Sequence, residues 1–338
     1  MLRDACPVRH AGAHGRAGPH VRRTSLVTGE TTCMNDDIVR VIDRVPGVVK
    51  PLATIDVADL DPDTFRSRHV GRHVPLLIKG AARHWPALRL WNEPGHLENL
   101  AEDREVKMSD TFNPQPADAY YRYTARKTRL ADGLRQMRDA DPGSTCSIPS
   151  IALPPTWAKD LGDYPFLDAG LDKAPRQFPR NRLFVYRNAS TDWHYHSFDE
   201  TITTQIAGSK RISMFRLTQQ NWWPYSQLIE SNLHHTPCGA KFFPAELPLV
   251  KYEGVIEAGD SVYIPPFWWH GIDPADTSMG FTLAHCFRTP INRLADMSDP
   301  VVRRILSRVA ANRKKELPCI LFMIARSTLS RRLAGEAW

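Results

Sequence analysis

Cysteine is scarce and scattered in this 338-residue chain. The six cysteines stand at positions 6, 33, 146, 238, 286 and 319, and no two of them form a Cys-x-x-Cys pair. A chain of this size does not need disulfides to stabilise a core, so the pattern predicts free thiols in a reducing cytoplasm.

Long apolar runs are also missing. The longest, near residues 319–325, is far below the 18 to 20 apolar residues of a membrane span, so no membrane association is expected. Residues 1–33 contain arginine, histidine, glycine and alanine without the apolar stretch of a secretory signal. This composition predicts a disordered leader, with the ordered chain beginning near Met34.

Charge gives little indication of a partner. The formal net charge is +7, but much of the excess lies in the two terminal segments, which favours solvated surface charge over nucleic-acid binding. A hydrophobic content of 42% is enough for one sizeable core.

The segment around His194 and His196 carries the strongest functional signal. Successive side chains of a strand alternate between its faces, so these two histidines would point the same way, roughly 6 to 7 Å apart. One metal ion can bridge that spacing. A satisfied core histidine is the usual explanation for a single histidine, but it explains a His-x-His pair less well.

His270 is the candidate third ligand. It follows residues 261–264, which read as a buried strand that Pro265 and Pro266 then stop. Three imidazoles with a nearby carboxylate, Asp199 or Glu200, suit a first-row transition metal such as Fe, Cu, Ni, Zn or Mn.

Other segments predict a mostly β chain. Residues 183–186 and 280–287 read as strands, and residues 202–207 and 211–215 read as two strands joined by a Gly208-Ser209 hairpin turn. The proline-rich span 147–179 predicts an irregular excursion, and such loops commonly build substrate walls.

Two signature segments resemble a known family. They are RLFVYRNASTDWHYHSFDETITTQIAGSKRISMF, from Arg182 to Phe215, and GDSVYIPPFWWH, from Gly259 to His270. Together with residues 65–91 they look like the cupin-like, Jumonji-C-type Fe(II)- and 2-oxoglutarate-dependent oxygenases. The resemblance covers roughly residues 45–290.

The resemblance implies a double-stranded β-helix, that is, a cupin or jelly-roll barrel with N-terminal and C-terminal helices. We therefore expect a catalytic domain over residues 34–290 and a helical segment over 291–338. The C-terminal helices resemble the dimerising helices of several family members, so we expect either a homodimer or packing of these helices on their own barrel. The implied cofactors are Fe(II), 2-oxoglutarate as cosubstrate and dioxygen.

The chain departs from the family at the metal. The family's first signature is His-x-Asp, whereas His196 stands at the second position here. The older cupin signature instead matches His194, His196 and Glu200, with His270 as the fourth ligand. Replacing the carboxylate with an imidazole removes one negative charge and favours nitrogen-loving metals such as Cu or Ni.

Further roles are implied by the resemblance alone. Lys210 corresponds to the lysine that pairs with the distal carboxylate of 2-oxoglutarate, while Thr191 and Tyr121 match residues that contact the same cosubstrate. His285, inside the apolar run 280–287, stands where the family has a polar residue beside the iron. We expect it to be an acid-base group, a supporting residue or a substitute ligand, or else a satisfied buried histidine.

Three functions follow as hypotheses. The first is a 2-oxoglutarate-dependent oxygenase that hydroxylates a peptide side chain or a small metabolite. The second is a three-histidine cupin oxygenase, lyase or isomerase that needs no 2-oxo acid. The third is a non-catalytic binding module whose metal is structural or absent.

Overall fold

The computed structural model describes residues 41–109, 125–175, 178–196, 199–216 and 249–288, together with Pro318 and Ala325. The predicted leader and nearly all of the predicted C-terminal helical segment lie outside these residues. None of the helices in the described ranges has the length and apolar character needed to cross a bilayer.

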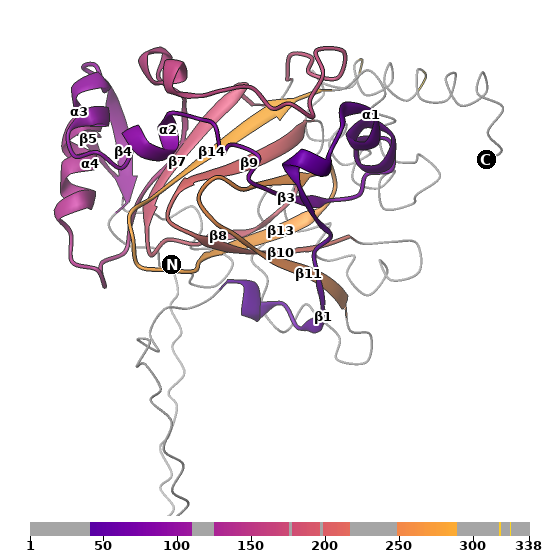
Figure 1. Ribbon diagram of the computed structural model, residues 1–338. Helices are drawn as coiled ribbons and strands as arrows, with labels where there is room; N and C mark the ends of the chain where they lie inside the picture. The colour runs from indigo at the N-terminus through magenta and orange to yellow at the C-terminus, as the bar shows by residue number, and fades with distance from the viewer. Residues whose placement is uncertain are drawn as a thin grey trace, which may run out of the picture. The chain divides into compact units, whose positions relative to one another are not determined.

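Two β-sheets dominate the structure (Figure 1). The smaller sheet has five strands, in the order β1 (Gly47–Pro51), β11 (Leu249–Ile256), β10 (Lys210–Phe215), β13 (Trp269–Pro274) and β8 (Thr191–His194). The larger sheet has nine, in the order β2 (Thr54–Asp56), β3 (Leu76–Lys79), β12 (Ser261–Ile264), β9 (Glu200–Ala207), β14 (Gly280–Phe287), β7 (Asn181–Arg187), β6 (Cys146–Ala152), β4 (Glu105–Ser109) and β5 (Ala125–Arg129). The predicted mostly β, cupin-type jelly roll is confirmed, although the two sheets do not close into a single barrel.

Short helices flank the two sheets. They are η1 (Ile42–Arg44), η2 (Val57–Asp59), α1 (Pro62–Thr64), η3 (Phe65–Val70), α2 (Ala87–Leu90), α3 (His96–Leu100), α4 (Leu130–Asp139) and η4 (Pro155–Asp160). Asp61 caps the start of α1, because its carboxylate accepts a hydrogen bond from the Thr64 backbone N–H at 2.8 Å. α3 and α4 lie beside β4 and β5 at one end of the molecule (Figure 1).

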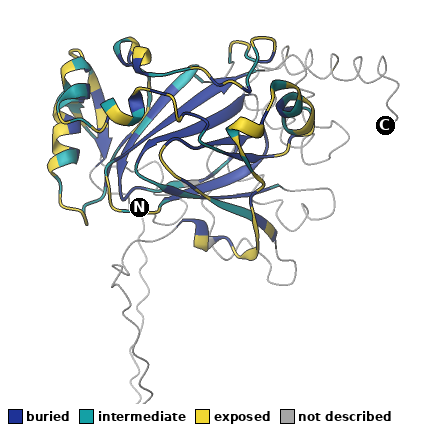
Figure 2. Ribbon diagram, viewed as in Figure 1, coloured by how far each residue is buried: buried dark blue, intermediate teal, exposed yellow. Residues whose placement is uncertain are grey.

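Each face of the larger sheet has its own apolar core. One face packs on the helices through side chains such as Phe65, Trp91, Trp157 and Tyr263. Between the two sheets lies a second core, which includes Met214 of β10 and Val262 of β12. The strands are consequently the most buried part of the fold, while the helices expose one side to solvent (Figure 2).

The predicted hairpin at Gly208-Ser209 is wrong. The turn is present, with Gly208 at a φ of +71°, but it carries the chain from one sheet to the other. β9 pairs with β12 and β14, whereas β10 pairs with β11 and β13. Each strand therefore has both of its edges occupied by partners that are distant in the sequence.

The prediction of an irregular span over residues 147–179 is wrong at its start, because residues up to Ala152 belong to strand β6. β6 tolerates Pro149 because its register with β7 shifts between Ile148 and Ile151, with Ser150 at a φ of +40°. A proline inside a strand is commonly accommodated by such a bulge.

Candidate metal centre

Three histidines converge between strands β8 and β13. His194 is the last residue of β8 and pairs with His270, the second residue of β13. Their ring centroids are 4.1 Å apart, and the ring of His196 lies 5.2 Å from His194 and 5.0 Å from His270. One ring nitrogen from each residue lies within 4.8 Å of the other two, so a single ion can bridge them after small side-chain rotations.

Hydrogen bonds to two of the rings orient them for ligation. The Nδ1 of His270 lies 3.0 Å from the backbone oxygen of Trp268, which can only accept, so Nδ1 carries the proton and Nε2 the lone pair. The Nδ1 of His196 lies 2.9 Å from the Thr201 hydroxyl. The Phe267 backbone N–H donates to the His196 carbonyl at 2.8 Å, which fixes the chain just beyond β8. Metal-binding histidines commonly use one ring nitrogen in this way.

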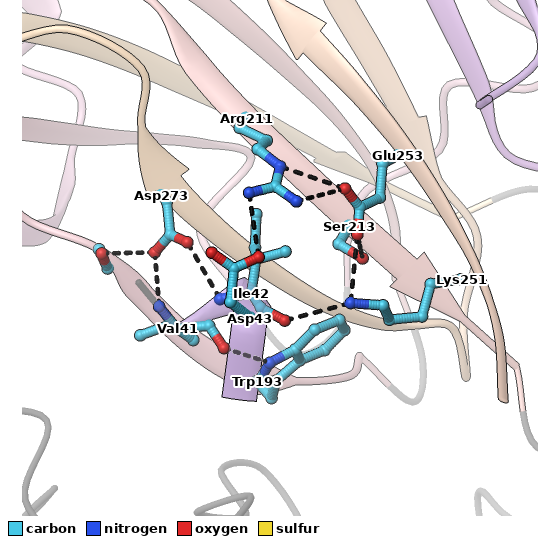
Figure 3. Close-up of polar contacts among 10 residues, drawn as sticks. Val41, Ile42, Asp43, Trp193, Arg211, Ser213, Lys251, Glu253 and Asp273 are labelled. Carbon is cyan, nitrogen blue, oxygen red and sulfur yellow. Dashed lines mark hydrogen bonds and ion pairs between the residues drawn. The ribbon is translucent and has the colours of Figure 1, made fainter. Parts of the chain in front are cut away.

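The opposite face of the five-stranded sheet is clamped by the chain around η1 (Figure 3). Trp193, the neighbour of His194, donates its indole N–H to the Val41 carbonyl at 2.9 Å. The buried Asp273 carboxylate accepts hydrogen bonds from the backbone N–H groups of Val41 and Ile42 and from the Ser190 hydroxyl. The strands that present His194 and His270 are therefore held from behind.

A second group in the same clamp backs strand β10 (Figure 3). The Arg211 guanidinium donates to the Glu253 carboxylate at 2.6 and 3.1 Å and to Asp43 at 3.1 Å. Lys251 donates to the Ile42 carbonyl at 3.3 Å and lies 3.2 Å from Glu253. Arg211 directly follows Lys210, so the two side chains project to opposite faces of β10. The ion pairs of Arg211 therefore fix the strand that presents Lys210 on the face away from the clamp.

Lys210 is a buried cation on the inner face of the five-stranded sheet. It is only 3% exposed, and its Nζ lies 3.7 Å from the ring centroid of Tyr186. No carboxylate among the described residues pairs with it, and burial lowers the pKa of its amine to about 7. An uncompensated buried ammonium is costly, so this position suits an anionic ligand.

A polar network fixes the ring beneath Lys210. The Gln205 amide donates to the Tyr186 hydroxyl at 2.6 Å, and the Thr282 hydroxyl donates to the Gln205 side-chain oxygen at 2.8 Å. The Tyr186 ring crosses Gly280, where an added Cβ would stand 2.1 Å from a ring carbon. Only glycine at position 280 allows this placement.

Thr191 shares the inner face with the histidines. A spacing of three would ordinarily put Thr191 and His194 on opposite faces of a strand. The register shift between β8 and β13 changes this, because His194 pairs with His270 while Thr191 pairs with Ile272, and the two β13 residues share a face. The structure therefore places Thr191, Lys210 and the three histidines on one side of the sheet.

Glu200 is not brought to the metal centre. Thr201 reaches His196, so its strand neighbour Glu200 points to the opposite face of β9, where its carboxylate accepts a hydrogen bond from Tyr263 at 2.7 Å. Burial raises the pKa of Glu200 to about 8, and the Asp199 charge adds to the effect. Asp199 also lies outside the histidine cluster, and its carboxylate accepts the Phe178 backbone N–H at 3.1 Å.

His285 also points away from the metal centre. Its neighbour Cys286 pairs with Thr201 and shares its face, so His285 projects toward the helix-covered side of the nine-stranded sheet. There its ring nitrogens lie 2.8 Å from the Asn181 side-chain oxygen and 3.2 Å from the Asp172 carboxylate. The interpretation as a satisfied buried histidine fits this geometry, and the expected acid-base or ligand role does not.

Tyr121, the third predicted cosubstrate residue, lies outside the described residues. Sequence reasoning missed four inner-face residues that the structure reveals: Arg182, Tyr186, Thr201 and Gln205. Alternation of side chains between the two faces of each strand could have identified these residues. It assigns a face only when the strand's pairing partners are known.

Comparison with known proteins fits this arrangement. The family described as Cupin-like domain matches residues 62–287, which span both sheets and all three histidines. The chain belongs to this cupin-like family. Among its relatives are the lysine-specific demethylase JMJ30 of Arabidopsis thaliana, at 25% identity over 208 residues, and the Jumonji C domain-containing protein 5 of Drosophila melanogaster, at 22% identity over 230 residues.

The two alignments cover 58% and 64% of this cupin-like protein, and 46% and 56% of the relatives. The chain thus spans about half the length of the curated relatives it matches. The comparisons establish the cupin-like family for this chain. Its own substrate and reaction do not follow from them.

Proposed function

We propose that this protein is a metal- and 2-oxoglutarate-dependent oxygenase that hydroxylates a peptide side chain or a small metabolite. The observation that carries the proposal is the shared inner face on which His194, His196, His270, Thr191 and Lys210 lie. Paired residues share a face, and Met214, which pairs with His270, lies four residues beyond Lys210 on β10. One metal-binding cluster and one buried cation therefore occupy the same side of one sheet.

The donor set fits a first-row metal ion. Three imidazole ligands leave several coordination sites of the metal ion open, as a site that binds both a 2-oxo acid and dioxygen requires. A bound Fe(II) ion would supply the chemistry that activates dioxygen for oxidation of an unactivated C–H bond. His194, His196 and His270 would hold this ion.

The remaining inner-face residues would bind and orient the cosubstrate. Lys210 of β10 pairs with Pro274 of β13. Pro274 lies four residues, or about 13 Å, along β13 from His270. That separation allows the lysine to pair with the distal carboxylate of a dicarboxylic 2-oxo acid whose other end lies near the histidines. Thr191 would donate a hydrogen bond to the same molecule, and Val262, Ile264 and Trp268 in the core between the sheets would limit the access of water.

A spectroscopic titration tests this proposal. Addition of Fe(II) and then 2-oxoglutarate under anaerobic conditions should give a weak visible charge-transfer band in the wild-type protein. Lys210→Met should remove the dependence of this band on 2-oxoglutarate while leaving metal binding intact. Absence of the band in a wild-type protein that has bound iron would contradict the use of 2-oxoglutarate.

One observation favours a second candidate function, a three-histidine cupin enzyme that uses no 2-oxo acid. No carboxylate among the described residues joins the histidine cluster, and Glu200 faces the other side of its strand. Three neutral ligands leave the full charge of a divalent ion uncompensated, which favours an anionic substrate bound directly to the metal. Metal-dependent oxygen uptake that does not change on addition of 2-oxoglutarate would favour this candidate.

A further inference from the structure

Arg182 is a second buried cation on the inner face of the nine-stranded sheet. It is 7% exposed and pairs with Ala284 across β7 and β14, and Ala284 and Cys286 lie on the same face of β14. Cys286 in turn pairs with Thr201, whose hydroxyl contacts His196. The guanidinium therefore belongs to the side of the sheet that faces the metal centre.

The guanidinium lacks the partners that a buried arginine needs. Its Nε is buried without a hydrogen-bond partner, and one Nη donates a long bond of 3.3 Å to the Ser150 hydroxyl. No carboxylate in the described ranges forms an ion pair with it, although the Cys286 thiol is close enough to accept a hydrogen bond. A buried charge is usually paired. The remaining N–H groups of Arg182 therefore indicate that a ligand binds there.

Aromatic rings define the direction from which a ligand can approach. The central carbon of the guanidinium lies 3.8 Å from the ring centroid of Phe178 and 5.4 Å from that of Phe184. Phe178 covers one face of the planar group, so its in-plane edge remains for binding. That edge matches the planar, bidentate geometry of a carboxylate.

The location of Arg182 suits a substrate better than the cosubstrate. Arg182 and Tyr186 are four residues apart on β7, about 13 Å along the strand, and Lys210 lies on the Tyr186 ring. The two buried cations thus lie near opposite ends of β7, Arg182 on that strand and Lys210 against its Tyr186 ring. Phe178 also lies 5.1 Å from the His196 ring, so a group bound at Arg182 lies next to the metal centre.

We propose that Arg182 binds a carboxylate group of the primary substrate and so restricts this enzyme to acidic substrates. A carboxylate fits better than a phosphate, because a single guanidinium offers one planar bidentate edge, the geometry that a carboxylate matches. Ser150 of β6 and Phe178, near the end of the proline-rich span, both contact Arg182, so both would border the substrate site. This inference rests on the proposed function, since it names the substrate class of the same site.

Nuclear magnetic resonance of the full chain labelled with ¹⁵N-arginine tests the proposal. The probes are acetate and N-acetylalanine, with acetamide and N-acetylalaninamide as uncharged controls. We expect the two carboxylates to shift the Arg182 Nε–H resonance in a saturable manner and the two amides to leave it unchanged. The resonance is assigned by its loss in Arg182→Gln. If neither carboxylate shifts it, Arg182 only packs on Phe178 and the proposal is wrong.

Calorimetry on matched variants gives a second measurement. Arg182→Gln should weaken N-acetylalanine binding at least tenfold, whereas Arg180→Gln, which removes an equal charge from the Asp172 ion pair on the helix-covered side, should leave it unchanged. Equal binding by the wild type and Arg182→Gln would overturn the proposal. So would a shift of the Arg182 resonance by 2-oxoglutarate combined with loss of the anaerobic absorption band in Arg182→Gln, because Arg182 would then bind the cosubstrate.

Failure of the proposed function is separable from failure of this inference. Loss of the Fe(II)-2-oxoglutarate band in the wild type removes the oxygenase proposal, while a carboxylate-dependent shift at Arg182 still establishes the anion site. A normal absorption band in the wild type with no carboxylate binding at Arg182 would keep the oxygenase proposal and remove the anion site.

Discussion

His194 and His270 face each other across the β8–β13 pair, with their ring centroids 4.1 Å apart. A backbone pairing, and not a loop, sets this separation, and the η1 clamp supports both strands from behind. The histidine cluster is therefore preorganised by the sheet itself.

Glu200→Gln should preserve metal binding. Its carboxylate faces Tyr263 on the opposite side of β9, and a glutamine can still accept that hydrogen bond. Metal content after purification and reconstitution checks this prediction, with His196→Ala as the metal-deficient comparison. Loss of metal from Glu200→Gln would restore Glu200 as a ligand.

The same substitution should change the pH dependence of stability. Because burial raises the folded pKa of Glu200 to about 8 from 4.5, the unfolded chain releases this proton first, and stability falls as pH rises from about 4.5 to 8. Glu200→Gln should remove that fall, and above pH 8 it should stabilise the protein by about 2–4 kcal/mol. Urea denaturation at pH 5 and pH 9 measures the difference. A variant that is less stable than the wild type at pH 9 would contradict the prediction.

Lys210→Met should stabilise the ligand-free protein. The folded pKa of Lys210 is lowered from 10.5 to about 7, so the unfolded chain binds the proton more tightly and stability rises with pH between these values. The stabilisation by Lys210→Met should be on the order of 3–5 kcal/mol at pH 7 and should disappear above pH 10.5. Thermal unfolding across this range tests it, with the exposed Lys107→Met as the matched control.

Binding of 2-oxoglutarate should take up a proton above pH 7. The amine of Lys210 is mostly neutral there in the free protein, whereas a bound carboxylate favours the ammonium form. Affinity should therefore fall as pH rises from 7 to 9. Calorimetry in two buffers of different ionisation enthalpy measures the proton uptake. A pH-independent affinity with no proton uptake would show that Lys210 does not contact the ligand.

Asp273→Ala should destabilise the fold by about 2–4 kcal/mol, since three donors lose their acceptor: two backbone N–H groups and the Ser190 hydroxyl. Asp43→Ala is the matched control. Asp43 is half-exposed and pairs only at the surface with Arg211, so its loss should cost under about 1 kcal/mol. Equal effects of the two substitutions on equilibrium denaturation would contradict a structural clamp at Asp273.

The sequence predicted the histidine cluster because its signal is local. A spacing of two brings His194 and His196 together even though β8 ends at His194, and Trp269 and His270 begin a strand soon after the two prolines. Predicting the position of Glu200 required counting strand alternation through residues 195–199. Residues 195, 196 and 199 are not in a strand, so the count loses its meaning.

Long-range pairing explains the other differences. A Gly-x turn at Gly208 predicts a reversal of the chain, but partners distant in sequence decide whether the flanking strands pair with each other. His285 could be placed in a strand from its apolar neighbours. Its face could be assigned only after the pairing of Cys286 with Thr201 was known.

Metal stoichiometry tests the central claim most directly. Elemental analysis after anaerobic reconstitution with Fe(II) should give one equivalent of metal per wild-type chain and less than a tenth of an equivalent in His270→Ala. Circular dichroism should show that the variant remains folded. Full metal occupancy in folded His270→Ala, or none in the folded wild type, would contradict a metal centre built on these three histidines.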